Sequence, residues 1–174
     1  MVVTHDSSLD PTAFTPAIDE TFSIELENPA QEVALSFDIA DPSPIDLERS
    51  ISVIQQVLDI VNRERGQAGL SPLRLQSQLT AAAQEHSNDM ARNNFLNHTG
   101  SDGSSPFDRI KRHGYNFRRA AENIAVGYSS PEDVMRGWMK SNGHRKNILN
   151  SNYRDIGIGS APGNQPYWTQ TFGG

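Results

Sequence analysis

Apolar residues recur with a helical period in two long segments of the chain. The first segment follows Ser50, and glycines at positions 66 and 69 end its pattern. The second runs from about Ser77 to Asn94. The two stripes consist of Ile51, Ile54, Val57, Leu58 and Val61, and of Leu79, Ala82, Ala83, His86 and Met90. We expect two amphipathic helices, and we expect the stripe histidine to be a hydrogen-bonded core residue.

Two shorter helices follow in the second half of the chain. Ser105 is placed to cap a helix over residues 106–112. Ser130, followed by Pro131, is a second helix start, and we expect this helix to continue to Gly143.

The C-terminal segment changes to a period of two. Isoleucines alternate with glycines over residues 156–159, and residues 167–172 follow after a turn rich in proline and glycine. This pattern predicts an antiparallel pair of strands. Helices followed by closing strands predict the α+β class.

Charge is divided unevenly along the chain. Residues 1–48 hold 11 of the 21 acidic residues, five of the ten prolines and none of the 15 Lys and Arg residues. We interpret residues 1–49 as an acidic, largely extended arm and residues 50–174 as the folded domain. Two alternating stretches in the arm, residues 22–27 and 33–37, form strands only if they meet a partner. A disordered leader and a partner-binding segment both remain open.

The composition excludes several classes of site. The 174 residues are 36% apolar, which is enough for one domain with a core. There is no cysteine, which excludes a disulfide scaffold, a zinc–thiolate site and a thiol nucleophile. We see no transmembrane segment, and the N-terminus lacks the basic and apolar regions of a signal peptide, so the export route stays open.

Five basic residues cluster around Gly114: Arg109, Lys111, Arg112, Arg118 and Arg119. We interpret them as a solvated face, with docking of the acidic arm as a second interpretation. No nucleic-acid reader motif accompanies them, and we expect no nucleic-acid partner.

Three segments each place one chemically active side chain beside small residues. These side chains are His98, Glu122 and His144, and we expect each at the end of an element, where sites are commonly assembled. Two imidazoles and a carboxylate can hold a divalent metal with an open position. They can equally act as a general acid and base. The alternative to a metal or catalytic site is a structural role, in which these polar side chains connect loops by hydrogen bonds and the glutamate is the partner of one histidine.

Four motifs occur in order along the chain. They are Glu-Asn-Ile-Ala-x-Gly at 122–127, Trp-Met-x-Ser-x-Gly-His-Arg-x-Asn-Ile-Leu at 138–149, Ile-Gly-Ile-Gly at 156–159 and Tyr-Trp-Thr-Gln-x-Phe at 167–172. With them, the chain over about residues 53–173 resembles the bacterial branch of the CAP/SCP superfamily. That superfamily groups cysteine-rich secretory proteins, insect venom antigen 5 and plant pathogenesis-related 1 proteins.

The resemblance implies a three-layer α-β-α sandwich with a cleft that is lined by two histidines and two glutamates and with which divalent metal has been associated. His98, Glu122 and His144 match three of those four positions. Ser141 stands where animal and plant members have the second glutamate, which puts in doubt any mechanism that needs two carboxylates. Zinc is the metal we expect, because neutral imidazole suits it, with the glutamate as a ligand or as the acceptor that orients one imidazole.

These features favour a binding module, a monomeric CAP domain of the extracellular or cell-surface kind. Its cleft residues His98, Glu122, Ser141 and His144 are expected to bind a divalent metal, with a lipid, glycan or peptide as a further ligand. The alternative is a metal-assisted hydrolase acting on peptide or cell-envelope material, in which the glutamate or a histidine activates a water. A third hypothesis is an adhesion or defence-related protein without chemistry.

Overall fold

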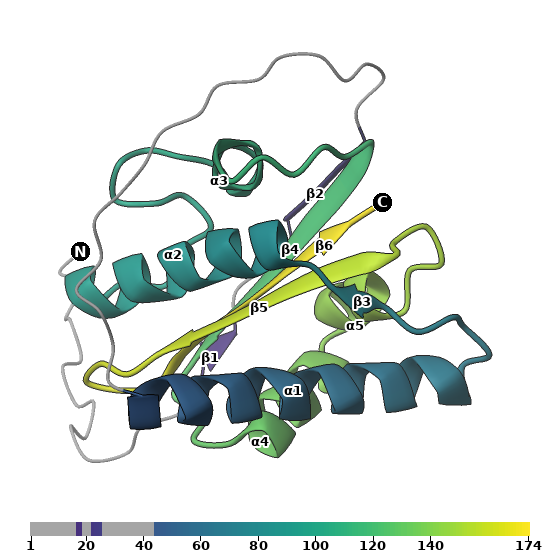
Figure 1. Ribbon diagram of the computed structural model, residues 1–174, viewed down its shortest axis with the longest axis horizontal. Coiled ribbons are helices and arrows are strands. Elements are labelled where there is room, and N and C mark those ends of the chain that lie inside the picture. The colour runs from purple at the N-terminus through teal and green to yellow at the C-terminus, as the bar shows by residue number, and fades with distance from the viewer. Residues whose placement is uncertain (1–16, 19–21, 26–43) are drawn as a thin grey trace, which may run out of the picture.

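The chain folds into three layers, with one sheet between two layers of helices (Figure 1). The computed structural model describes residues 17–18, 22–25 and 44–174. Helices α2 (Ser77–Asn93) and α3 (Pro106–Arg112) cover one face of the sheet. The other face carries α1 (Pro44–Gln67), α4 (Pro131–Lys140) and α5 (Asn142–Ile148). The predicted α-β-α sandwich of the α+β class is confirmed.

Two helix boundaries differ from the prediction. Helix α1 begins at Pro44, so the predicted boundary between residues 49 and 50 falls inside a helix. A proline fits the first helical turn because the missing N–H has no partner there in any case. The helix predicted to reach Gly143 ends instead at Lys140, and α5 starts after the extended residue Ser141 (φ −84°, ψ 125°).

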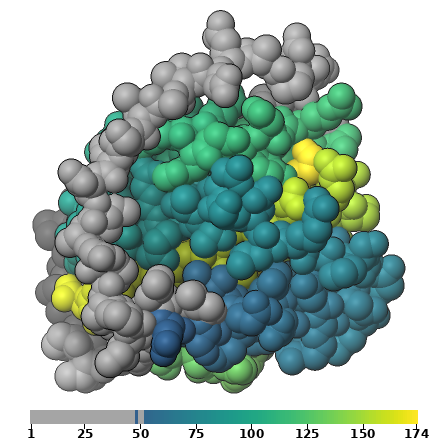
Figure 2. Space-filling model, viewed as in Figure 1, coloured from purple at the N-terminus to yellow at the C-terminus, as the bar shows by residue number. Residues whose placement is uncertain are grey.

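Within the described residues, six strands form the sheet, in the order β1-β4-β6-β5-β3, with β2 also paired to β4. They are β1 (Ala17–Ile18), β2 (Phe22–Glu25), β3 (Arg74–Leu75), β4 (Arg119–Val126), β5 (Asp155–Ala161) and β6 (Tyr167–Gly173). Strands β5 and β6 pair antiparallel as predicted, while β3 runs parallel to β5. The space-filling view shows β5 as a narrow band between α2 and α1 (Figure 2).

The acidic arm contributes two strands to this sheet. Both β1 and β2 pair antiparallel with β4, and Phe22 lies opposite Glu122 in the register. The alternating stretch that begins at residue 22 was predicted to form a strand only with a partner. Strand β4 is that partner. The stretch at 33–37 lies outside the described residues.

Strand β4 has no counterpart in the sequence prediction. Seven of its eight residues are buried, because α3 packs on one face and α5 on the other. A strand buried on both faces loses the alternation that marks a half-exposed strand. The polar residues Glu122 and Asn123 also interrupt its apolar run, so neither the period nor a continuous apolar stretch revealed it.

Close packing of α2 on β5 depends on two glycines. A Cβ added at Gly157 would overlap the backbone of Leu79, and one at Gly159 would lie 2.5 Å from the carbonyl of Ala83. The helix therefore lies directly on the backbone of the strand. This approach fixes the position of α2, which carries the buried His86.

Replacing Gly157 by alanine should destabilise the fold, because the new methyl group meets helix backbone that cannot move alone. We expect a loss of about 3 kcal/mol in the free energy of unfolding, measured in urea. The matched control is Gly66→Ala in α1, where an added Cβ meets nothing within 4 Å. That change should be neutral or raise stability by about 0.5–1 kcal/mol. Equal stability of the two variants would refute this packing.

Candidate functional site

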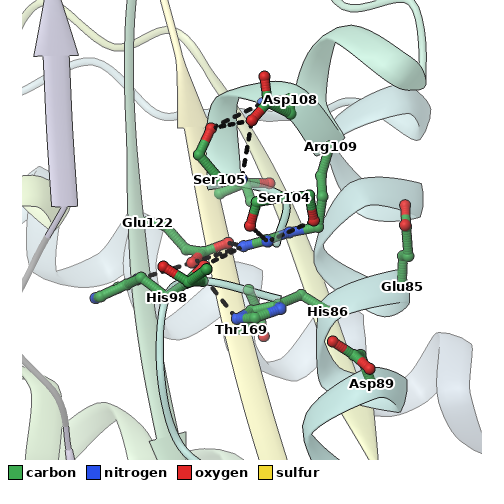
Figure 3. Close-up of polar contacts among 12 residues, drawn as sticks. Glu85, His86, Asp89, His98, Ser104, Ser105, Asp108, Arg109, Glu122 and Thr169 are labelled. Atoms are coloured by element: carbon green, nitrogen blue, oxygen red, sulfur yellow. Dashed lines mark hydrogen bonds and ion pairs between the residues drawn. The ribbon is translucent and has the colours of Figure 1, made fainter. Parts of the chain in front are cut away.

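Glu122 occupies the middle of β4 and is completely buried. The prediction that it stands at the end of an element is wrong, because the sheet continues on both sides of it. Its side chain lies on the face covered by α2 and α3 (Figure 3). A carboxylate removed from water in this way must be compensated by charge and hydrogen bonds.

Arg109 in α3 supplies that charge. Its Nη2 donates to both carboxylate oxygens of Glu122, at 3.0 Å to Oε2 and 3.2 Å to Oε1. The side chain is only 2% exposed, so for this residue the predicted solvated face is wrong. Nη1 also donates to the carbonyl of Ser104, at 2.9 Å. The capping box formed by Ser105 and Asp108 fixes the start of α3 and so the place from which the arginine extends (Figure 3).

His98 meets the same carboxylate from the loop after α2. Its Nδ1 lies 2.8 Å from Oε1 of Glu122. Burial opposes ionisation of this carboxyl, but the hydrogen bond from His98 and the charge of Arg109 outweigh it and hold the pKa of Glu122 below its ordinary value. An ionised carboxylate only accepts, so Nδ1 is the donor. When the ring is neutral, Nε2 therefore carries no proton and has the lone pair that can accept a hydrogen bond or bind a metal.

His86 supports the loop that carries His98. It is fully buried in α2, and its Nε2 lies 2.9 Å from the carbonyl oxygen of Asn97. Burial lowers the pKa of His86, so the ring is neutral at pH 7 and Nε2 donates to that carbonyl. The prediction of a hydrogen-bonded core histidine is confirmed. The carbonyl of His98 in turn accepts from Arg109 Nη2 at 3.0 Å, which ties the loop to the ion pair.

His144 lies in α5 and is 2% exposed. Its Nδ1 is 2.7 Å from the hydroxyl oxygen of Ser141, which makes no side-chain cap to the helix. The backbone carbonyl oxygen of His144 accepts a hydrogen bond from Nδ2 of Asn123 at 3.3 Å. Because successive strand residues point to opposite faces, Glu122 and Asn123 reach the two helical layers from one point of β4.

The structure thus brings two of the three predicted ligands into direct contact, His98 and Glu122. His144 contacts Ser141 through its ring and Asn123, the strand residue next to the glutamate, through its carbonyl oxygen. Within residues 17–18, 22–25 and 44–174, no three His, Asp or Glu side chains gather as a metal cluster. A three-ligand zinc site with Glu122 as ligand does not fit, because its oxygens face Arg109 and His98. In general, two imidazoles with a carboxylate hydrogen-bonded behind one of them are a common donor set for zinc.

Three surface hollows of about 310, 420 and 520 Å³ lie elsewhere on the molecule. Two of them border α4, and the third lies beyond the C-terminal end of α1. None of these three is lined by His98, Glu122, Ser141 or His144. The predicted cleft over these residues therefore stays a prediction.

The fold and the motif residues define a family. Residues 58–172 match the model of the CAP: Cysteine-rich secretory protein family. This chain therefore belongs to the CAP family, although it has no cysteine. Among the part of the chain that the structure describes, no helix is long and apolar enough to cross a membrane.

The relatives are bacterial. The chain is 42% identical over 118 residues to the uncharacterized protein YkwD of Bacillus subtilis, and 36% identical over 118 residues to the uncharacterized membrane protein YlbC of the same organism. These matches cover 68% of this chain but only 46% and 33% of the relatives, so the chain spans less than half of either protein.

Solved structures share the fold. A crystal structure of an extracellular protein containing a SCP domain from Bacillus anthracis superposes with a TM-score of 0.70 at 31% identity, over 78% of this chain and 45% of that one. An outer surface protein of Borrelia burgdorferi superposes with a TM-score of 0.63 at 21% identity, over 76% of this chain and 95% of that one. The second likeness shows the fold alone.

Replacing Arg109 by methionine should destabilise the domain strongly, because it leaves the Glu122 carboxylate buried without its cation. We expect a loss of about 3–5 kcal/mol in the free energy of unfolding, measured in urea at pH 7. Lys111→Met is the matched control, since Lys111 is an exposed cation of the same helix. A further variant that combines Arg109→Met with Glu122→Gln should recover part of the loss. Equal effects of the two single changes would contradict a structural ion pair.

Proposed function

We propose that this CAP domain is an extracellular binding module that holds a divalent cation, zinc by preference, through the imidazoles of His98 and His144. In this proposal Glu122 is not a ligand. It is the hydrogen-bond acceptor that lies behind His98 and orients its ring. A lipid, glycan or peptide that binds beside the cation is the further ligand we expect.

The hydrogen bond from His98 Nδ1 to Glu122 carries the proposal. Metal-binding histidines commonly donate their second ring nitrogen to a carboxylate, which fixes the tautomer and makes the ring more basic. Here that carboxylate is ionised and held by Arg109 Nη2 at 3.0 Å. In this proposal, Nε2 is therefore the nitrogen that binds the cation.

His144 supports the proposal in a similar way. Its Nδ1 lies 2.7 Å from the hydroxyl of Ser141, which the proposal treats as the acceptor, so that Nε2 is the nitrogen proposed to bind the cation. Ser141 occupies the position of the second glutamate in animal and plant members. Its hydroxyl serves here as a neutral partner, which leaves Glu122 as the only carboxylate the proposal uses.

The extracellular location rests on the relatives. The protein from Bacillus anthracis with 31% identity is described as extracellular, and the Bacillus subtilis relative YlbC as a membrane protein. We propose that this domain works outside the cytoplasm.

Zinc titration of the metal-free protein by calorimetry tests the proposal. We expect one ion per chain, loss of binding in both His98→Ala and His144→Ala, and an affinity about 10–100-fold weaker in Glu122→Gln. His113→Ala is the matched control, because His113 pairs with Glu85 at 2.7 Å and should leave binding unchanged.

Circular dichroism of each variant establishes that the fold is retained before binding is compared. Absence of binding by the wild type would overturn the proposal. Equal binding by the wild type and either histidine variant would overturn it as well, and would assign the two histidines a structural role.

A further inference from the structure

We propose that a second site, at the C-terminal end of α1, binds an oxyanion, that is, a phosphate or carboxylate group. The site is the hollow of about 520 Å³, which we call the α1-end pocket. The chain leaves α1 there and turns into β3, at the right-hand end of the helix in Figure 1. Three arginines line it, one from the helix and two from the sheet edge: Arg65, Arg74 and Arg154.

Arg65 is a buried cation with no carboxylate partner among the described residues. It is 1% exposed, and its Nε donates to the carbonyl of Ser71 at 2.9 Å. Its Nη1 donates to the carbonyls of Ile148 and Asn150 at 2.8 and 2.9 Å. These three carbonyl groups accept hydrogen bonds from the N–H groups of Arg65, but they carry no full negative charge that would balance the guanidinium. Buried charges in proteins are usually paired with an opposite charge. The guanidinium stays protonated, so the wall of the pocket carries a fixed positive charge.

The two other arginines stand side by side where β3 meets β5. The backbone N–H of Arg74 donates to the carbonyl of Arg154 at 3.0 Å. Asp155 is the carboxylate beside them, and both of its oxygens are engaged. Oδ1 accepts from Arg74 Nε at 3.1 Å, and Oδ2 accepts from the Tyr115 hydroxyl at 2.7 Å.

The charges of the pocket therefore do not balance. Asp155 offsets Arg74, while no described residue gives Arg65 or Arg154 an ion-pair partner. The surplus is two positive charges around one hollow. An arginine fork matches the geometry of carboxylate and phosphate oxygens, so an oxyanion is the complementary ligand.

The pocket is open to a ligand. Gly69 lines it with a positive φ of 72°, and a Cβ placed there would meet nothing within 4 Å. Arg154 is exposed and the side chain of Arg74 is 75% exposed, so both guanidinium groups can reach an incoming anion. In the strand order, β6 and β5 separate β3 from the β4 strand of Glu122. The α1-end pocket therefore shares no lining residue with the histidine site.

Titration with inorganic phosphate, followed by ¹⁵N–¹H NMR of backbone and arginine side-chain groups, tests the inference. Sodium acetate is the second probe, and sodium chloride at matched ionic strength is the reference. We expect saturable shifts at Gly69, Arg74 and Arg154 with phosphate, acetate or both, and not with chloride.

Arg154→Gln should weaken the affinity about tenfold, because it removes a charged donor from the pocket while leaving the Arg74–Asp155 pair intact. Arg136→Gln, an exposed arginine on α4, is the matched control and should not change it. Shifts that stay linear and equal those with chloride would overturn the inference. An affinity unchanged in Arg154→Gln would also overturn it.

Discussion

The buried charge of Glu122 is the constraint on which the candidate site depends. A carboxylate in the middle of a sheet is tolerated only if a cation and hydrogen-bond donors surround it, and Arg109 and His98 do so at 3.0 and 2.8 Å. That requirement places α3 over β4 and draws the loop after α2 onto the sheet. The imidazole of His98 is consequently held in one tautomer by a group that stays charged.

The rest of the fold makes this arrangement rigid. Glycines in β5 let α2 lie directly on strand backbone, which fixes His86 and, through the Asn97 carbonyl, the loop of His98. On the opposite face, Asn123 joins β4 to α5 through the carbonyl of His144. One strand therefore links both histidine segments to the core. The same sheet ends at β3, where the arginines of the α1-end pocket carry a surplus of positive charge.

Much of this could be predicted from the sequence, and the failures have physical causes. Helix starts such as Ser105 with a following proline carry local signals, and the glycine-interrupted strand at 156–159 has a clear period. Strand β4 carries no period because both of its faces are buried. The partner of Glu122 was missed because an arginine in a basic cluster resembles a solvated face until the fold shows it 2% exposed. The family resemblance located His98, Glu122 and His144, but only the structure shows which histidine contacts the carboxylate, namely His98.

The tautomer of His98 tests the account most directly. The ¹⁵N chemical shifts of its ring, measured on the full chain at a pH where the ring is neutral, report which nitrogen carries the proton. We expect a protonated Nδ1, donating to Glu122, and an unprotonated Nε2. A neutral ring with its proton on Nε2 and a bare Nδ1 would contradict the role assigned to the Glu122–Arg109 pair.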